Sequence, residues 1–421
     1  MADPTRLNRR YSVIRRLGDG AGGAVYLVHD EHGNGRELAA KVVPGADPAT
    51  RALLLGEFRR LASLSHPCLV TVFDLETVVA PVDGFAVGTL FFTAQYIPGV
   101  DLATAVPAAH DRLETLLAVA EDVAAALEHS HVAGLLHCDV KPSNVLVQSR
   151  GHGARATLLD LGLSAARGIR GEPRGTLAYM SPEALAGAPT ARSDLYGLGA
   201  TLFQAATGRA PFEPAESSSD PSSDSAALIR AICDGAAPVN RALGPAAAAL
   251  PAGVADLIDR LLAVDPVDRP SSAAVVLDEL AQLRDGLGLE RAEAAPSRAG
   301  RVTVLPPALI GRGDELAMLE RALAPAGPRL IRLHGPPGVG RHALLRQAIR
   351  ARQLEAAAGR ALPVQVVWGD PDRLAAALGA QTADAPGDAA HAVARYVDRV
   401  LALAATAAGS SQLILVVETE D

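Results

Sequence analysis

Hydrophobic and polar positions change their spacing several times along the chain, and each spacing predicts a type of secondary structure. Between Tyr11 and Val43, short apolar runs are separated by glycine-rich turns, which is typical of β-strands. A helical pattern follows at residues 51–65, and residues 69–79 and 88–97 predict further strands. Long helical periodicity begins at residues 113–134. The pattern predicts a strand-rich small lobe followed by a helical large lobe, an α+β arrangement in two parts.

Two segments without periodicity predict flexible chain. Ser217–Ser225 is a low-complexity polar run, which predicts a flexible surface loop. Residues 285–306 mix Pro, Ala and charged residues, and they predict a linker. Beyond the linker, strand, glycine-rich turn, helix and strand alternate, which indicates an α/β domain. The predicted domains are residues 1–284, with lobes of residues 1–97 and 98–284, and residues 307–421.

Composition limits the partners and the compartment. The 421-residue chain has a formal net charge of −8 and no dense Lys/Arg block, which argues against nucleic acid as a partner. Cys68, Cys138 and Cys233 form neither a disulfide framework nor a paired metal spacing, which indicates a reducing compartment. The N-terminus lacks the apolar stretch of a signal peptide, and no apolar run approaches about 18 residues. We therefore expect a cytoplasmic protein without a membrane span.

Lysine is almost absent from the chain. Of 39 Lys and Arg residues, only Lys41 and Lys141 are lysines, so wherever a general cation is sufficient the sequence uses arginine. Lysine is a compact point charge on a thin stem, whereas arginine is a wide planar fork. A site that keeps lysine in this background needs that shape, and a phosphate pocket is the leading candidate.

A glycine-rich segment precedes Lys41. Gly18, Gly20, Gly23 and Val25 match the pattern G-x-G-x-x-G-x-V. A dinucleotide-binding turn would open into a helix, but here the chain continues as a strand. The segment is either a hairpin that folds over phosphates or a flexible hairpin without function, and the motif alone does not separate the two.

Further motifs follow in a fixed order along the chain. Lys41 ends a predicted strand, Glu57 lies on the next helix, "HCDVKPSN" supplies Asp139 and Asn144, and "LLDLG" supplies Asp160. "GTLAYMSPE" and "DPVDRP" come later. The series resembles the protein kinase family from about Tyr11 to Leu283, and it looks most like the bacterial serine/threonine kinases of eukaryotic type. The resemblance implies a bilobal kinase fold and phosphorylation of Ser or Thr on protein substrates in bacterial signalling.

The resemblance implies a nucleotide and metal site that uses ATP and Mg²⁺. Lys41, fixed by an ion pair with Glu57, would hold the α- and β-phosphates, and Asp160 and Asn144 would bind Mg²⁺. The backbone from Gln95 to Ile97 would read adenine, behind a small Ala94. The other implied nucleotide contacts are Gly18, Gly20, Gly23, Val25 and Ala39.

The resemblance also implies the groups that act on the reacting atoms. Asp139 would accept the proton of the substrate hydroxyl. Lys141 would steady the transferred phosphate, and Thr176 would brace this pair. Asp194 and an ion pair between Glu183 and Arg269 would be structural supports. Both lysines of the chain therefore fall at phosphate positions.

One position departs from the family. The usual His-Arg-Asp is here His137-Cys138-Asp139. Cysteine cannot form the ion pair that arginine forms with a phosphorylated residue of the activation loop. Between Asp160 and Gly175 only Ser164 carries a hydroxyl. We expect a non-RD kinase controlled by the helix of Glu57 or by the C-terminal domain. Neutral drift at one position is the alternative.

A zinc site in "HSHVAGLLHC" is a second reading of the same region. His129 and His131 are two residues apart, so they do not share a helix face. His137 and Cys138 belong to the motif above. Both facts argue against zinc.

The C-terminal region contains a second phosphate-type motif. Gly335 to Gly340 keep the spacing of a P-loop, but Arg341 and His342 replace its Lys and its hydroxyl residue, and Glu418 stands where Asp is usual. This region resembles the AAA/STAND-like ATPases fused to bacterial kinases. We expect a partial, degenerate P-loop domain. A pseudokinase that scaffolds partners through this domain is the alternative to an active kinase.

Overall fold

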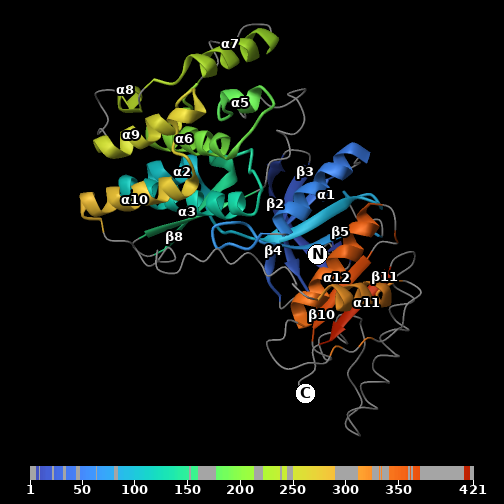
Figure 1. The fold of residues 1–421 in the computed structure, drawn as a ribbon. Coiled ribbons are helices and arrows are strands. Elements are labelled where there is room, and N and C mark those ends of the chain that lie inside the picture. The colour runs from blue at the N-terminus through green and yellow to red at the C-terminus, as the bar shows by residue number, and fades with distance from the viewer. Residues whose placement is uncertain are drawn as a thin grey trace. The chain divides into compact units, whose positions relative to one another are not determined.

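The computed structural model describes residues 6–8, 10–20, 23–31, 35–43, 48–62, 64–79, 84–150, 153–159, 177–212, 221–237, 239–243, 250–289, 312–324, 331, 333, 341–358, 361, 364–369 and 412–417. The chain forms two compact units (Figure 1). The strand unit contains residues 1–58, 72–96 and 307–421, and the helical unit contains residues 59–71 and 97–306. The C-terminal region therefore belongs to the same compact unit as the predicted small lobe.

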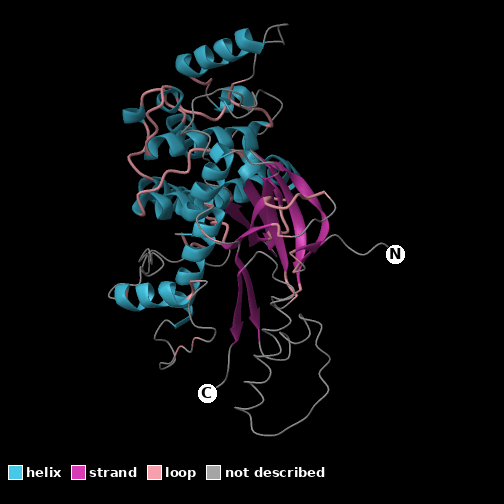
Figure 2. Ribbon diagram, turned by 90° about the vertical axis from the view of Figure 1, so that its right-hand side faces the viewer, coloured by secondary structure: helices cyan, strands magenta, loops and turns pink. Residues whose placement is uncertain are grey.

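The strand unit contains a six-stranded antiparallel sheet (Figure 2). Its spatial order is β1-β2-β3-β4-β6-β5. The strands are β1 (Arg6–Leu7), β2 (Tyr11–Gly20), β3 (Gly23–Asp30), β4 (Glu37–Val43), β5 (Val72–Thr77) and β6 (Leu90–Gln95). These confirm the strands predicted from the apolar runs.

The two faces of this sheet have different neighbours because side chains alternate along a strand. Leu38, Ala40 and Val42 of β4 pack in one buried cluster with Tyr11 and Phe91. On the opposite face, Phe92 of β6 contacts Phe58 of helix α1 (Pro48–Ala62), with ring centroids 5.9 Å apart. Helix α1 therefore covers the face that also carries Lys41.

The C-terminal region of the strand unit consists of helices and parallel strands. Its elements are α11 (Gly313–Ala322), α12 (Arg341–Ala357), β10 (Val364–Gly369) and β11 (Gln412–Val417). Strands β10 and β11 pair in parallel, and the helices bury Leu319, Leu344 and Ile349 in a common cluster. These elements fit the predicted α/β character. Residues 334–340 and Glu418 lie outside the described residues.

Helices dominate the helical unit. They are α2 (Leu102–Ala108), α3 (Arg112–Val132), α5 (Pro182–Leu185), α6 (Ala191–Thr207), α7 (Pro221–Asp234), α8 (Val239–Leu243), α9 (Ala252–Leu261) and α10 (Ala273–Leu287). A small sheet contains β7 (Val100–Asp101), β8 (Val145–Arg150) and β9 (Gly153–Leu158). Asp111 accepts a hydrogen bond from Glu114 N at the start of α3, and Gly208 ends α6 in the left-handed conformation, so local sequence fixes these boundaries.

Two sequence predictions were wrong in part. The segment Ser217–Ser225 is not loop throughout, because α7 begins at Pro221; Pro at the first helical position and nearby Ser and Asp favour a helix start. The linker does not begin at residue 285, because α10 continues to Leu287 and ends at Gly288 with φ of 65°.

Candidate functional site

Lys41 lies on the sheet face of the strand unit that helix α1 covers. Val25 and Phe92 lie directly opposite Lys41 on the neighbouring strands, and Ala39 lies opposite Ala94. Residues opposite one another share a face, so these side chains line one surface. Lys41 is only 6% exposed, and its Nζ lies 5.9 Å from the Phe92 ring centroid. The face therefore combines one cation with small and apolar groups.

The glycine-rich segment forms the hairpin of β2 and β3. A Cβ on Gly23 would lie 2.3 Å from Val42 O, so no side chain fits there. Gly18 pairs with Val25, and a Cβ there would meet no atom within 4 Å. Gly20 pairs with Gly23 at the end of the hairpin. Gly23 is thus required by close packing, whereas Gly18 leaves open space above the strand.

Helix α1 lies on the Lys41 face through Phe58, the residue after Glu57. The side chain of Glu57 lies outside the described residues, so its ion pair with Lys41 stays a prediction.

The predicted adenine-reading segment lies at the end of β6. Ala94 is buried, Gln95 is exposed, and Ile97 is 5% exposed, with its carbonyl accepting from Gly99 N at 2.8 Å. Gln95 ends the strand opposite Leu38, and its role in reading adenine stays a prediction.

In the helical unit, Asp139, Lys141 and Asn144 form one polar cluster. Lys141 Nζ lies 2.7 Å from Asp139 Oδ2, and Asn144 Nδ2 donates to the same oxygen at 2.8 Å and to the Asp139 carbonyl at 2.9 Å. Asn144 directly precedes β8, and its carbonyl accepts a hydrogen bond from Leu159 N at 2.8 Å. The carboxylate is therefore held in place by a cation and an amide.

Asp194 of α6 anchors the loop that carries Asp139. Its carboxylate accepts from His137 N at 2.8 Å and from Cys138 N at 2.7 Å, and it contacts His131 Nε2 at 2.8 Å. Cys138 has φ of 63°, a conformation that costs a non-glycine residue energy. The charged acceptor offsets this cost. Asp194 is therefore the predicted structural support.

Two further contacts fix this loop. His137 is fully buried, with Nε2 donating to Leu159 O at 2.8 Å and Nδ1 accepting from Asp139 N at 3.3 Å. The predicted ion pair is also present, since Arg269 Nη1 lies 2.7 Å from Glu183 Oε1. The contact of His131 with Asp194 was not predicted, because the sequence around His131 suggested only a zinc ligand.

Part of the predicted site is not described. Asp160, Ser164 and Thr176 lie outside the described residues. Within the described part of the chain, no group of three His, Cys, Asp or Glu residues is arranged to hold a metal ion, and His131 bonds Asp194 instead. Among the helices of that same part, none has the length and apolarity needed to cross a bilayer.

Comparisons with known proteins agree with this geometry. Residues 11–280 match a family model described as protein kinase domain. The DNA damage-responsive serine/threonine-protein kinase RqkA of Deinococcus radiodurans is 32% identical over 352 residues, which cover 75% of this chain and 50% of that protein. The serine/threonine-protein kinase PknK of Mycobacterium tuberculosis is 31% identical over 384 residues, covering 81% and 32%. The probable serine/threonine-protein kinase pknA2 of Bifidobacterium longum is 31% identical over 343 residues, covering 76% and 41%. The chain thus spans between about a third and half of the length of these curated relatives.

Proposed function

We propose that this chain, which belongs to the protein kinase family, transfers the γ-phosphoryl group of ATP to Ser or Thr residues of protein substrates. The strand-rich and helical parts fit the bilobal fold of that family. The observation that carries the proposal is the cluster of Asp139, Lys141 and Asn144, because it pairs a carboxylate with a cation and an amide. Its relatives named as serine/threonine kinases support the choice of acceptor residue.

The residues fit ATP and Mg²⁺ by their chemistry. Gly23 packs too closely for a side chain, and Lys41 lies on a face lined by Ala39 and Ala94, so a flat base and a phosphate chain suit this face. Asn144 uses its amide nitrogen on Asp139, which leaves its amide oxygen as the ligand atom for a hard cation. Asp160 would supply a carboxylate ligand. Bound Mg²⁺ supplies neutralisation of phosphate charge.

Asp139 acts on the acceptor hydroxyl. Its carboxylate takes the proton of the Ser or Thr hydroxyl as that oxygen bonds to the γ-phosphorus and the bond to the β-phosphate oxygen breaks. Lys141, 2.7 Å from Asp139, places a positive charge beside the same reaction centre, and this charge favours the transferred phosphate oxygens.

Incubation of the chain with γ-labelled ATP, Mg²⁺ and a generic protein substrate tests the proposal. We expect label on phosphoserine or phosphothreonine, and loss of transfer when EDTA removes the metal. The pseudokinase alternative predicts saturable ATP binding without transfer to any protein. That result would refute the enzymatic assignment.

We further propose that activity does not depend on activation-loop phosphate. An arginine before the catalytic aspartate is an unpaired cation until a phosphate joins it, but Cys138 carries no such charge. We expect phosphatase-treated protein and a Ser164→Ala variant to keep initial rates within about twofold of untreated enzyme. A tenfold drop that preincubation with ATP restores would contradict this. Autophosphorylation should fall elsewhere, and we expect it in the serine cluster Ser217–Ser225.

The region of residues 307–421 is proposed to be a degenerate P-loop domain of AAA/STAND type. Arg341 is wider than the usual lysine, and imidazole at His342 is a poor substitute for a metal-binding hydroxyl. Steady ATP hydrolysis that survives Asp139→Asn and disappears on Gly340 substitution would disprove this. Cytoplasmic location and the absence of a nucleic-acid partner remain expectations from composition, whereas protein substrates are implied by the kinase domain.

A further inference from the structure

Strand β5 is an edge strand, yet most of its side chains are buried. It is the last strand in the sheet order, and an edge strand normally presents its backbone groups and one side to solvent. Asp74 is 9% exposed and Glu76 is 3% exposed. Two carboxylates buried on a sheet edge require a covering element and compensating charge.

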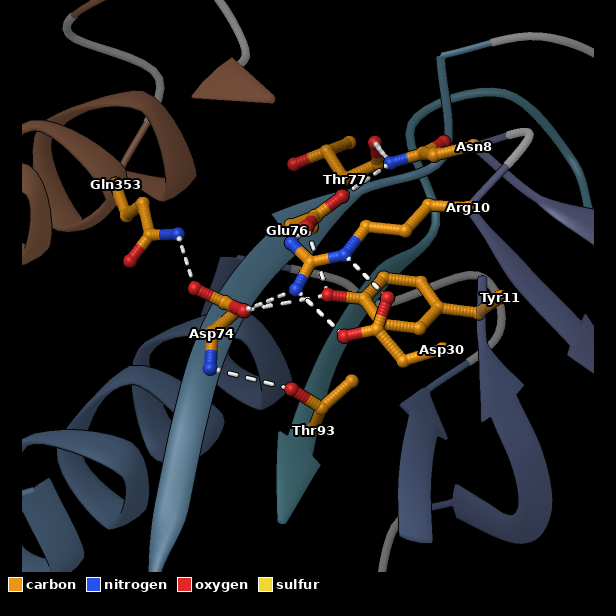
Figure 3. A network of polar contacts seen from close by, with 9 residues as sticks. All are labelled: Asn8, Arg10, Tyr11, Asp30, Asp74, Glu76, Thr77, Thr93 and Gln353. Carbon is orange, nitrogen blue, oxygen red and sulfur yellow. Dashed lines mark hydrogen bonds and ion pairs between the residues drawn. The ribbon is translucent and has the colours of Figure 1, made fainter. Parts of the chain in front are cut away.

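A single arginine from the N-terminal segment faces both of these acids and Asp30 of β3 (Figure 3). Arg10 binds Asp30 through two hydrogen bonds of 2.9 and 2.8 Å, and it lies 3.2 Å from Asp74 and 3.5 Å from Glu76. Tyr11 donates to both Asp74 and Glu76. The acid network, defined as Asp30, Asp74 and Glu76, therefore holds more negative charge than Arg10 neutralises.

The titration of Glu76 reflects its burial in this network. Burial, together with the neighbouring Asp74, raises the pKa of Glu76 to about 7, although Arg10 opposes the shift. Further positive charge beside the acid network is therefore favourable.

Helix α12 supplies both the cover and the charge. Gln353 is 2% exposed, and its Nε2 donates to Asp74 Oδ1 at 3.4 Å (Figure 3). Arg350 Nη2 donates to Val72 O at 3.4 Å, and its guanidinium interacts electrostatically with Asp74. The α12 sequence carries four arginines and one glutamate, so a basic helix lies on an acidic strand.

The same face of α12 also contacts α1. Arg350, Gln353 and Ala357 follow the spacing i, i+3, i+7, which places them on one stripe of the helix. Arg51 of α1 donates from Nη1 to Ala357 O at 3.2 Å, and from Nη2 to Gly88 O at 3.3 Å. The last carbonyls of a helix lack partners within the helix and favour a cation, so Arg51 is a suitable partner for the C-terminal end of α12.

We propose that the β5 edge is an internal docking surface for α12, and that docked α12 holds α1 in position through Arg51. Because α1 also carries Glu57, the predicted partner of Lys41, the C-terminal region is coupled to the nucleotide site. The proposal that docked α12 stabilises α1 is based on the contacts above. Only the expected effect on catalysis rests on the proposed kinase function.

Hydrogen exchange of the full chain tests the coupling without using activity. The docking variant carries Arg350→Glu and Gln353→Leu, which remove the donors to Val72 O and Asp74 Oδ1 on β5. We expect amide exchange in residues 48–62 to accelerate at least about fivefold. The matched control carries Arg321→Glu and Gln347→Leu, the same substitutions at exposed positions of α11 and α12, and should leave α1 within about twofold of wild type.

A second comparison isolates Arg51. Arg51→Met should accelerate exchange in α1 to a similar extent, whereas Arg59→Met, at an exposed position of the same helix, should not. Unchanged exchange in α1 in the docking variant would overturn the proposal. So would acceleration spread equally over β2 and β3, because α12 would then be a general part of the core.

Phosphoryl transfer provides a separate readout. In an active wild type, the docking variant and Arg51→Met should lower kcat with little change in the KM for protein substrate, since the proposed coupling acts on Glu57 and Lys41. An unchanged kcat despite faster exchange would overturn the link to catalysis. An inactive wild type would instead refute the proposed function, while the exchange comparison would still decide whether α12 holds α1.

Discussion

Asp139→Asn should lower the rate of phosphoryl transfer by about 10³-fold while ATP affinity stays near that of wild type. The amide cannot take the hydroxyl proton, and it removes the negative charge that Lys141 contacts at 2.7 Å. The shape is kept, and the amide oxygen can still accept from Asn144 Nδ2, so the loop should fold as before. Asp139→Asn should therefore lower kcat without lowering the stability of the fold.

Single-turnover transfer and equilibrium ATP binding measure the two quantities separately. Asp111→Asn is a matched control, because Asp111 is an exposed N-cap of α3 and asparagine caps a helix about as well. It should keep nearly the full rate. An Asp139→Asn protein with more than a tenth of the wild-type rate would show that Asp139 is not the base.

The cluster of Asp139, Lys141 and Asn144 could be expected from the sequence, because these residues are close along the chain. Asp139, Lys141 and Asn144 lie within six residues, so local geometry is enough to bring them together. Asp194 lies 55 residues beyond Asp139, and only the family resemblance indicated its role. The structure explains that role, because Asp194 accepts from His137 N and Cys138 N and so fixes the loop.

The contact between α12 and β5 could not be predicted from the sequence. Asp74 and Gln353 are 279 residues apart, and a helical pattern predicts a buried face without identifying the element that covers it. The acid network was missed for a similar reason. Arg10, Asp30 and Asp74 come from different strands or turns, and an isolated charge in a sequence normally predicts a solvated surface.

The helix start within Ser217–Ser225 shows another limit. Ser, Asp and Pro favour both loops and the first turn of a helix, so composition alone does not distinguish the two. The apolar positions Leu228 and Ile232, four residues apart and both buried, decide the outcome by packing α7 into the helical unit.

Arg269→Met should cost the helical unit about 3–5 kcal/mol of unfolding free energy. Arg269 is 3% exposed and donates to Glu183 at 2.7 and 3.0 Å. It also donates to the carbonyls of Ala263, Arg192 and Val264. Methionine fills much of the volume but leaves a nearly buried carboxylate and three carbonyls without this donor. Urea unfolding followed by far-ultraviolet circular dichroism measures the loss.

The pH dependence identifies Glu183 as the source of much of this loss. Burial alone would raise the pKa of Glu183, but hydrogen bonds from Arg269 and Ser193 outweigh burial and lower it to about 2. A folded pKa below the unfolded value of about 4.5 stabilises the fold above pH 4.5, and this contribution disappears as pH falls toward 2. Its size is about 3 kcal/mol for a side chain that is 16% exposed. The difference in unfolding free energy between wild type and Arg269→Met should therefore be full at pH 7 and shrink steadily below pH 4.5.

Arg260→Met is the control, because Arg260 and Glu279 form a more exposed pair and the substitution should cost under about 1 kcal/mol at either pH. Equal losses in the two variants, or a loss from Arg269→Met that does not change with pH, would show that the guanidinium contributes by packing alone.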